Sequence, residues 1–143
     1  VDVEPRAEAD EAEALARACA GLGVRFHRLF SSPYTRAAET AGPLTKHVRG
    51  GRLELLAELT GDDYAGLLDA LHRALNNTDT VVGLVGHEPY LSGLTSYLIG
   101  GGGGVGVRFR KGMMLRLDGE PEVGRLELHS ALPPGVLKRL AER

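Results

Sequence analysis

The chain has 143 residues and a mass of 15.2 kDa, which suits a single domain. Hydrophobic residues make up 43% and charged residues 25%, a composition that excludes a disordered tail and leaves enough apolar surface for a core. The net charge of −2, without a basic stripe or polybasic run, argues against nucleic acid and anionic membranes as partners. The single cysteine, Cys19, excludes an internal disulfide and a cysteine zinc cage, so a reducing, cytoplasmic compartment is expected.

The first third of the chain predicts two helices around one strand. Apolar residues at spacings of three and four over residues 8–22 predict an amphipathic helix, and residues 24–30 follow as a short strand. Ser32 and Pro33 match an N-cap followed by proline at the first helical position. The second helix therefore runs from here to Gly50-Gly51, with a small-residue face for close packing.

The middle of the chain predicts a strand–helix–strand–helix run. Residues 53–56 are apolar and predict a strand, and Asp62-Asp63 caps a leucine-rich helix that ends at Asn76-Asn77. Residues 80–85 are continuously apolar, as expected of a strand covered on both faces. The segment 86–89 then turns this strand into another helix.

The last third follows a glycine-rich stretch, residues 100–106. Three segments with apolar residues at every second position predict strands, and Asp118-Gly119 is a turn signal before the last of them: 105–109, 113–117 and 123–128. A short helix follows Pro133-Pro134. Alternating strands and helices, undivided by a linker, predict one α/β domain over residues 1–143, with three α/β/α layers, a mostly parallel central sheet and an antiparallel edge.

Two strand-to-helix turns carry the candidate functional residues, because ligands of open α/β sheets bind beyond the carboxyl ends of the strands. In the first turn, Arg36 falls in the first turn of a helix, where a cation is disfavoured. Free backbone amides beside a guanidinium suit the oxygens of a phosphate. The equally weighted alternative is that Arg36 pairs with Glu39 one turn later.

The second turn presents His87 at the end of a buried strand. An imidazole there can donate to an anion or act in acid–base chemistry, and the alternative is a histidine that caps a helix. Glu58 can reach the same end of the sheet as a general acid, or it is simply an exposed loop carboxylate. The other histidines have no metal spacing, so no metal and no cofactor is expected: His27, His47, His72 and His129.

The two turns together resemble the histidine phosphatase superfamily, whose fold is that of phosphoglycerate mutase. Residues 31–41 (SSPYTRAAETA) are similar to its SSP-x-x-RA-x-x-TA segment, and residues 85–92 (VGHEPYLS) are similar to a segment of its SixA-type phosphohistidine phosphatase branch. The resemblance implies phosphoryl transfer to a histidine and hydrolysis of the phosphohistidine, without a metal. It implies that Arg36 and His87 are catalytic, with Ser32 and Glu88 as further substrate-binding residues. Glu58 stands where mutase-like relatives carry a proton donor.

The nucleophile implied by the resemblance has no counterpart among the 143 residues, because the Arg-His-Gly motif of the family is absent. We expect an N-terminal strand ending in that motif, placed before Val1 or lost around residues 4–7. This strand is expected to lie between the strand that leads to Ser32 and the strand that leads to His87.

The leading interpretation is a monomeric phosphatase that hydrolyses phosphohistidine on a phosphotransfer protein. No long insertion is available as a lid, so the site should be shallow and open to a protein surface. The first alternative is a small-molecule phosphomonoesterase of the same superfamily. The second is an inactive phosphate-binding module that lacks the nucleophile.

Overall fold

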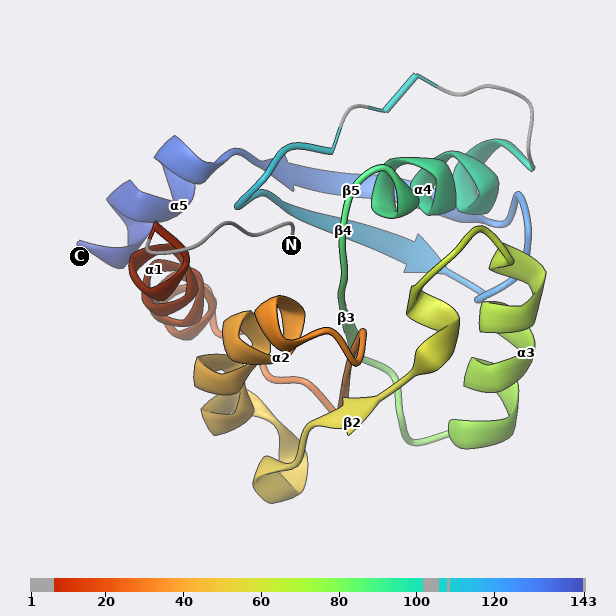
Figure 1. Cartoon of the computed structure of the whole chain (residues 1–143), viewed down its shortest axis with the longest axis horizontal. Helices are drawn as coiled ribbons and strands as arrows, with labels where there is room; N and C mark the ends of the chain where they lie inside the picture. Colours follow the sequence, from red (N-terminus) through yellow and green to blue (C-terminus); the bar gives the residue numbers. More distant parts are fainter. Residues whose placement is uncertain (1–6, 102–105, 108, 143) are drawn as a thin grey trace.

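The computed structural model describes residues 7–101, 106–107 and 109–142 (Figure 1). The elements are, in chain order, α1 (Ala7–Gly21), β1 (Arg28–Ser31), α2 (Thr35–Ala41), the 3-10 helices η1 (Gly42–His47) and η2 (Arg49–Gly51), β2 (Glu54–Leu55), η3 (Ala57–Leu59), α3 (Tyr64–Ala74), β3 (Val82–Val85), α4 (Tyr90–Gly100), β4 (Met114–Gly119), β5 (Leu126–Leu132) and α5 (Pro134–Ala141). Within the described ranges, none of these helices is both long and apolar enough to cross a membrane.

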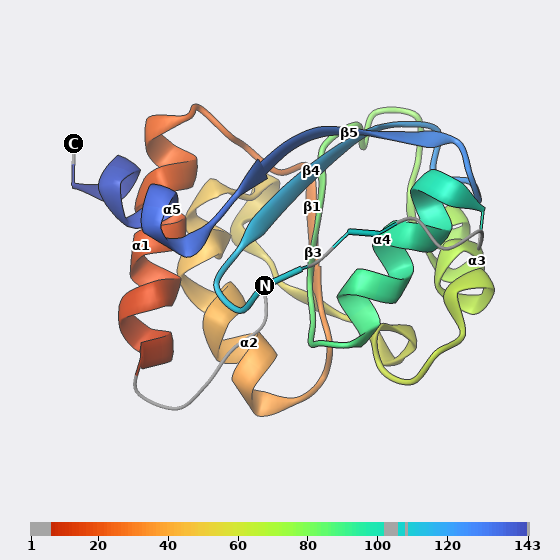
Figure 2. The ribbon, with the colours of Figure 1, turned by 90° about the horizontal axis from the view of Figure 1, so that it is seen from above.

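Helices cover the strands from two sides, as the alternation of elements predicts. Figure 2 shows α1, α2 and α5 on one side of the strands and α3 and α4 on the other. Successive residues of β1 point to opposite sides. Leu29 packs into a cluster with α1, α2 and α5, whereas Phe30 packs into a cluster with α3 and α4. Both side chains are 1% exposed. The α/β class with three layers is confirmed.

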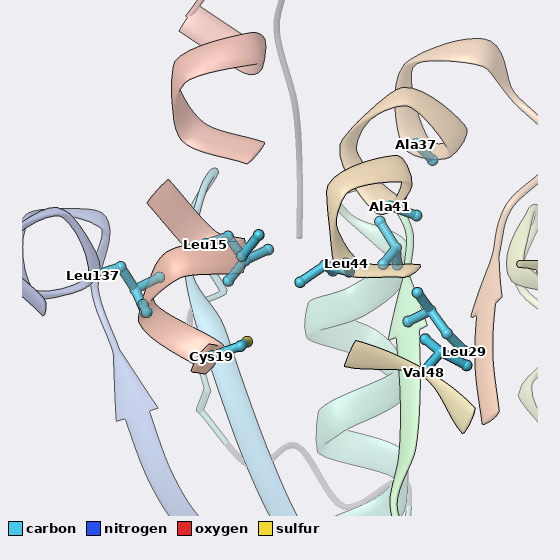
Figure 3. Packing of buried hydrophobic residues seen from close by; sticks show 11 residues of the cluster. Leu15, Cys19, Leu29, Ala37, Ala41, Leu44, Val48 and Leu137 are labelled. Atoms are coloured by element: carbon cyan, nitrogen blue, oxygen red, sulfur yellow. The ribbon is translucent and has the colours of Figure 1, made fainter. Parts of the chain in front are cut away.

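The first cluster depends on small side chains (Figure 3). Ala37 and Ala41 on α2 are fully buried, and Leu44 of η1 and Leu15 of α1 are 3% exposed. A helix with alanines on its inner face can approach its neighbours closely, because no long side chain separates the backbones. The predicted small-residue face of the second helix is therefore confirmed.

The parallel sheet has the strand order β2-β1-β3. β1 pairs directly with β3 from Arg28–Val82 to Ser31–Val85. The prediction that another strand separates these two is wrong, because their backbone groups already bond to one another. Among the described residues, β2 and β3 are the two edge strands of this sheet.

The predicted antiparallel edge forms a second sheet of its own in the described residues, in which β4 pairs with β5. The predicted turn at Asp118-Gly119 is wrong, since both residues belong to β4 and pair with Glu127 and Leu126. The connection follows at residues 120–125, where Gly124 has a positive φ of 68° that glycine adopts without strain. The backbone hydrogen bonds of six paired residues in β4 therefore outweigh the turn preference of Asp118 and Gly119.

Apolar side chains of β3, β4, α3 and α4 line a groove of about 730 Å³. Leu84 of β3, Leu94 of α4 and Leu117 of β4 contribute to its wall. β3 is therefore only partly covered on this side, which is why Val82 and Leu84 keep intermediate exposure.

The second helix and the strand predicted at residues 105–109 differ most from the structure. The second helix stops as an α-helix at Ala41 and continues as the 3-10 helix η1, because Gly42 and Pro43 interrupt the α-helical hydrogen bonds. Of the predicted strand 105–109, residues 105 and 108 lie outside the described part, and Gly106, Val107 and Phe109 belong to no strand. The amide of Phe109 donates to a side chain, Ser92 Oγ, instead of to a neighbouring strand.

A charged network joins the amino ends of the parallel strands. The Arg28 guanidinium donates to both carboxylate oxygens of Glu54 at 2.6 Å, to the Ala74 carbonyl at 2.7 Å and to Asp79 at 3.1 Å. A two-pronged bond between a guanidinium and a carboxylate is stronger than a single contact. The hydrogen bond from Arg28 holds the pKa of Glu54 below its ordinary value of 4.5.

We expect Glu54→Gln to lower the free energy of unfolding at neutral pH by on the order of 1 kcal/mol, because it removes the charge that Arg28 binds. Since the pKa of Glu54 is lower in the folded chain, its contribution is complete above its ordinary pKa and is lost as the pH falls through the folded value. Denaturant unfolding from about pH 7 to about pH 3 should therefore show a gap between wild type and variant that closes with acidification.

The exposed pair Arg116–Asp118 supplies the control, since its side chains are 60% and 51% exposed. Asp118→Asn should change stability by only a few tenths of a kcal/mol. A difference in the free energy of unfolding between wild type and Glu54→Gln that stays constant over the whole pH range would contradict the lowered pKa of Glu54.

Candidate functional site

The two candidate turns meet because β1 and β3 are parallel neighbours. Ser31 is in register with Val85, and the Ser32 amide donates to the Val85 carbonyl at 3.0 Å. The residues that follow each strand therefore leave the sheet side by side, at its carboxyl end. This places Ser32 and His87 at one site, as expected for ligand-binding turns of an α/β sheet.

A hydrogen bond joins the two turns. Ser32 Oγ and His87 Nε2 lie 2.8 Å apart, and Ser32 is fully buried. The Tyr34 amide donates to the same Oγ at 3.2 Å, so the hydroxyl is held from two directions. The Tyr34 ring contacts the imidazole at a tilt of 52°, with ring centroids 5.3 Å apart, although the tyrosine is itself 59% exposed. The imidazole of His87 is thus oriented before any substrate arrives.

Arg36 lies in the first turn of α2, as predicted, although the helix starts at Thr35 and not at Pro33. Its side chain is exposed. In the described part of the chain it makes no ion pair, and the alternative pair with Glu39 does not form. Arg36 is not among the residues that line the open groove beside His87, so its contact with a phosphoryl group stays a prediction.

Glu88 turns its carboxylate toward α4. One oxygen accepts from the Ser92 amide at 2.7 Å and the other from the Ser92 hydroxyl at 2.5 Å. The peptide bond from Glu88 to Pro89 is cis, and α4 begins at the next residue, Tyr90. The predicted contact between Glu88 and substrate stays a prediction, whereas its contacts with Ser92 are present in the folded chain.

An open groove of about 970 Å³ runs from His87 across the start of α4. Tyrosines shape it: Tyr64 contacts Tyr90 and Tyr97 edge-on, with centroids 5.2 and 5.6 Å apart. A Cβ at Gly93 would overlap the Tyr64 hydroxyl, so a larger residue there would displace the Tyr64 ring. The groove wall carries the carboxylates of Asp62 and Glu88 and, within the described ranges, neither lysine nor arginine.

The proton donor suggested by resemblance, Glu58, lies in η3 at the same end of the sheet. The Tyr90 hydroxyl donates to its carbonyl at 2.6 Å, and burial raises the pKa of that tyrosine, so it keeps its proton. The Glu58 carboxylate is half-buried but is not part of the groove wall that contains His87. Its role as a proton donor stays a prediction.

The remaining histidines lie away from this site, as expected. His27 precedes β1 at the opposite end of the sheet, where its Nδ1 accepts from the Val81 amide at 2.9 Å. The others are spread over different elements: His47 ends η1, His72 bonds to the Pro121 carbonyl from α3, and His129 lies on β5. No group of three or more metal-ligating side chains occurs among the described residues.

Cys19 offers no alternative nucleophile. It is fully buried, with its sulfur 3.9 Å from that of Met114. Burial raises the pKa of its thiol to about 11, so the thiol stays protonated at neutral pH. A protonated thiol is a poor nucleophile.

Sequence reasoning assigned no role to three residues that shape the site. Tyr34 contacts the His87 ring, Tyr64 lines the groove, and Ser92 bonds to Glu88. Tyr34 and Ser92 stand inside the two motifs, which is the signal that could have found them. Tyr64 lies outside both motifs, and only the packing of α3 against α4 brings it to the groove.

Comparisons with known proteins agree with the resemblance. The family model of the histidine phosphatase superfamily (branch 1) matches residues 7–80, which include Ser32 and Arg36. A solved structure, of the protein histidine phosphatase SixA complexed with tungstate, is similar with a TM-score of 0.79 at 22% identity, over 96% of this chain and 86% of that chain. None of the curated proteins compared matches the chain. The similarity to that structure shows the fold, and because the family model matches more than half of the chain, this chain belongs to the histidine phosphatase superfamily.

Proposed function

We propose that this protein hydrolyses phosphohistidine on a phosphotransfer protein. Membership of the histidine phosphatase superfamily supports a phosphatase activity in general. The observation that carries the finer proposal is the 2.8 Å contact between Ser32 Oγ and His87 Nε2, which holds an imidazole at the carboxyl ends of two paired strands. An oriented imidazole stabilises the charge that develops on a phosphoryl group in transit.

Arg36 supplies the second part of the phosphoryl site in this proposal. Its guanidinium is exposed and makes no ion pair in the described part of the chain. Planar guanidinium groups bind phosphate oxygens two at a time, which positions the phosphoryl group as well as neutralising it. The proposal assigns these binding groups and names no nucleophile, because no residue of the printed sequence matches the Arg-His-Gly motif.

The groove beside His87 supports a protein as the substrate. It is open and lined by tyrosines, and the acidic side chains in its wall, among the described residues, are those of Asp62 and Glu88. A metabolite with a second phosphate would be repelled by these carboxylates. A polypeptide surface with neutral or basic side chains around the phosphorylated residue fits the groove by charge and by its aromatic contacts.

The test compares two labelled substrates: a histidine-phosphorylated phosphotransfer domain and a sugar phosphate. Release of phosphate from the phosphohistidine domain, with little from the sugar phosphate, is expected. The reverse preference would favour a small-molecule phosphomonoesterase. Binding of tungstate without turnover of either substrate would support the alternative of an inactive phosphate-binding module. Tungstate is the probe because the similar SixA structure contains it.

A further inference from the structure

The turn that carries His87 is tied to α4 by hydrogen bonds of the histidine itself and of the residue that follows it. The His87 carbonyl accepts from the Leu91 amide at 2.9 Å. The next residue, Glu88, accepts from the amide and the hydroxyl of Ser92. The backbone of the turn is therefore anchored to the first turn of the helix at two successive residues.

Ser92 extends the connection to a third segment. Its hydroxyl donates to Glu88 and accepts from the Phe109 amide at 3.0 Å. Phe109 lies well beyond the end of α4 in the sequence and is buried in the cluster formed with α3 and α4. The Glu88 carboxylate thus ends a chain of hydrogen bonds that begins in the packed core.

Ion pairing does not explain why the Glu88 carboxylate is turned toward α4. It is half-buried and, in the described part of the chain, makes no salt bridge with lysine or arginine. Both carboxylate oxygens are engaged by Ser92. A carboxylate held this way adds negative charge beside an anion site, which is unfavourable unless its hydrogen bonds serve the site in another way.

We propose that Glu88 is a positioning residue: through Ser92 it sets the place of the His87 imidazole relative to Ser32. The proposal rests on the function proposed above, in which His87 stabilises the transferring phosphoryl group. A side chain that meets a transition state loses effect steeply when it is displaced, about 10²-fold for 1 Å. Loosening the turn should therefore lower kcat more than it raises KM, because Arg36 still binds the substrate phosphoryl group in the ground state.

The experiment compares Glu88→Ala, Glu88→Gln and Ser92→Ala, with Asp63→Ala as the control. Asp63 also caps a helix with its carboxylate, accepting from the Gly66 amide at 2.8 Å, but in the described part of the chain it makes no hydrogen bond or ion pair with the His87 turn. Each variant is measured for kcat and KM on the phosphohistidine domain. The nitrogen and proton chemical shifts of the His87 imidazole are recorded by NMR without substrate, together with thermal unfolding.

Glu88→Ala should lower kcat about tenfold or more with KM nearly unchanged. Glu88→Gln should restore kcat to within about threefold of wild type, because its amide oxygen still accepts from the Ser92 amide. Ser92→Ala should fall between the two, and the double variant Glu88→Ala with Ser92→Ala should be no worse than Glu88→Ala alone. Asp63→Ala should lower the melting temperature and leave kcat unchanged.

The NMR measurement separates this proposal from the proposed function. A shift of the His87 resonances in Glu88→Ala, absent in Asp63→Ala and reversed in Glu88→Gln, supports the positioning role even if the protein turns over another substrate. Unchanged His87 resonances in Glu88→Ala would overturn it. Equal losses of kcat in Glu88→Ala and Asp63→Ala would also overturn it, because they would reduce Glu88 to a helix cap.

Discussion

Replacing His87 by alanine is expected to lower kcat for the proposed phosphohistidine hydrolysis by about 10²- to 10³-fold, the effect of removing a group that stabilises transition-state charge in that proposal. The fold should remain intact. His87 is only half-buried, and its partner Ser32 still accepts from the Tyr34 amide after the imidazole is gone. A buried hydroxyl with a remaining partner costs little stability. Steady-state kinetics and thermal unfolding of the same sample measure the two effects.

His72→Ala is the matched control for this prediction. His72 bonds to the Pro121 carbonyl at 2.9 Å from the exposed side of α3 and takes no part in the site. The His72→Ala variant should therefore keep the kcat of the wild type. If His87→Ala unfolded at a much lower temperature than His72→Ala, His87 would be a structural cap, which is the alternative that the sequence left open.

Arg36→Ala is expected to weaken the binding of tungstate or vanadate by about 10- to 100-fold, since charge-assisted hydrogen bonds are stronger than neutral ones. Arg36→Lys should recover only part of the affinity, because an ammonium group cannot bind two oxygens in a plane. Neither variant should change thermal unfolding, because the side chain is exposed and makes no ion pair in the described part of the chain. Isothermal titration with the oxyanion measures the affinity.

Arg125 supplies the comparison, because its side chain is 68% exposed and its pair with Glu122 is remote from the site. Arg125→Ala should bind the oxyanion as the wild type does. Equal affinity of wild type and Arg36→Ala would refute the phosphoryl site proposed for the turn between β1 and α2.

Local sequence patterns determined most of the helices and their faces. The spacing of apolar residues located α1 and α3, and Asp63 caps α3 as predicted. The continuous apolar run ending at Val85 indicated a strand with helices on both faces, and its side chains do pack against both clusters, although the face with Val82 and Leu84 is only partly covered. These features depend on neighbours a few residues away, so the sequence carries them without knowledge of the fold.

The candidate residues were also readable from the sequence, but not what they contact. Arg36 and His87 stand out because each follows a strand and opens a helix. The bond between Ser32 and His87, 55 positions apart, exists because β1 pairs with β3 in a particular register. The attachment of Glu88 to Ser92 and onward to Phe109 likewise depends on where the chain returns after α4.

Strand partners were decided by the tertiary structure alone. The expectation of a strand between β1 and β3 failed because a strand sequence shows which faces are buried, not which neighbour its backbone bonds to. Asp118 and Gly119 have the composition of a turn, yet pairing with Glu127 and Leu126 keeps them in β4. Pairing between distant segments adds hydrogen bonds and buried area over a whole strand, which outweighs the turn preference of two residues. The sequence by itself determined most of the helices and the candidate residues for the site, and long-range pairing decided how they meet.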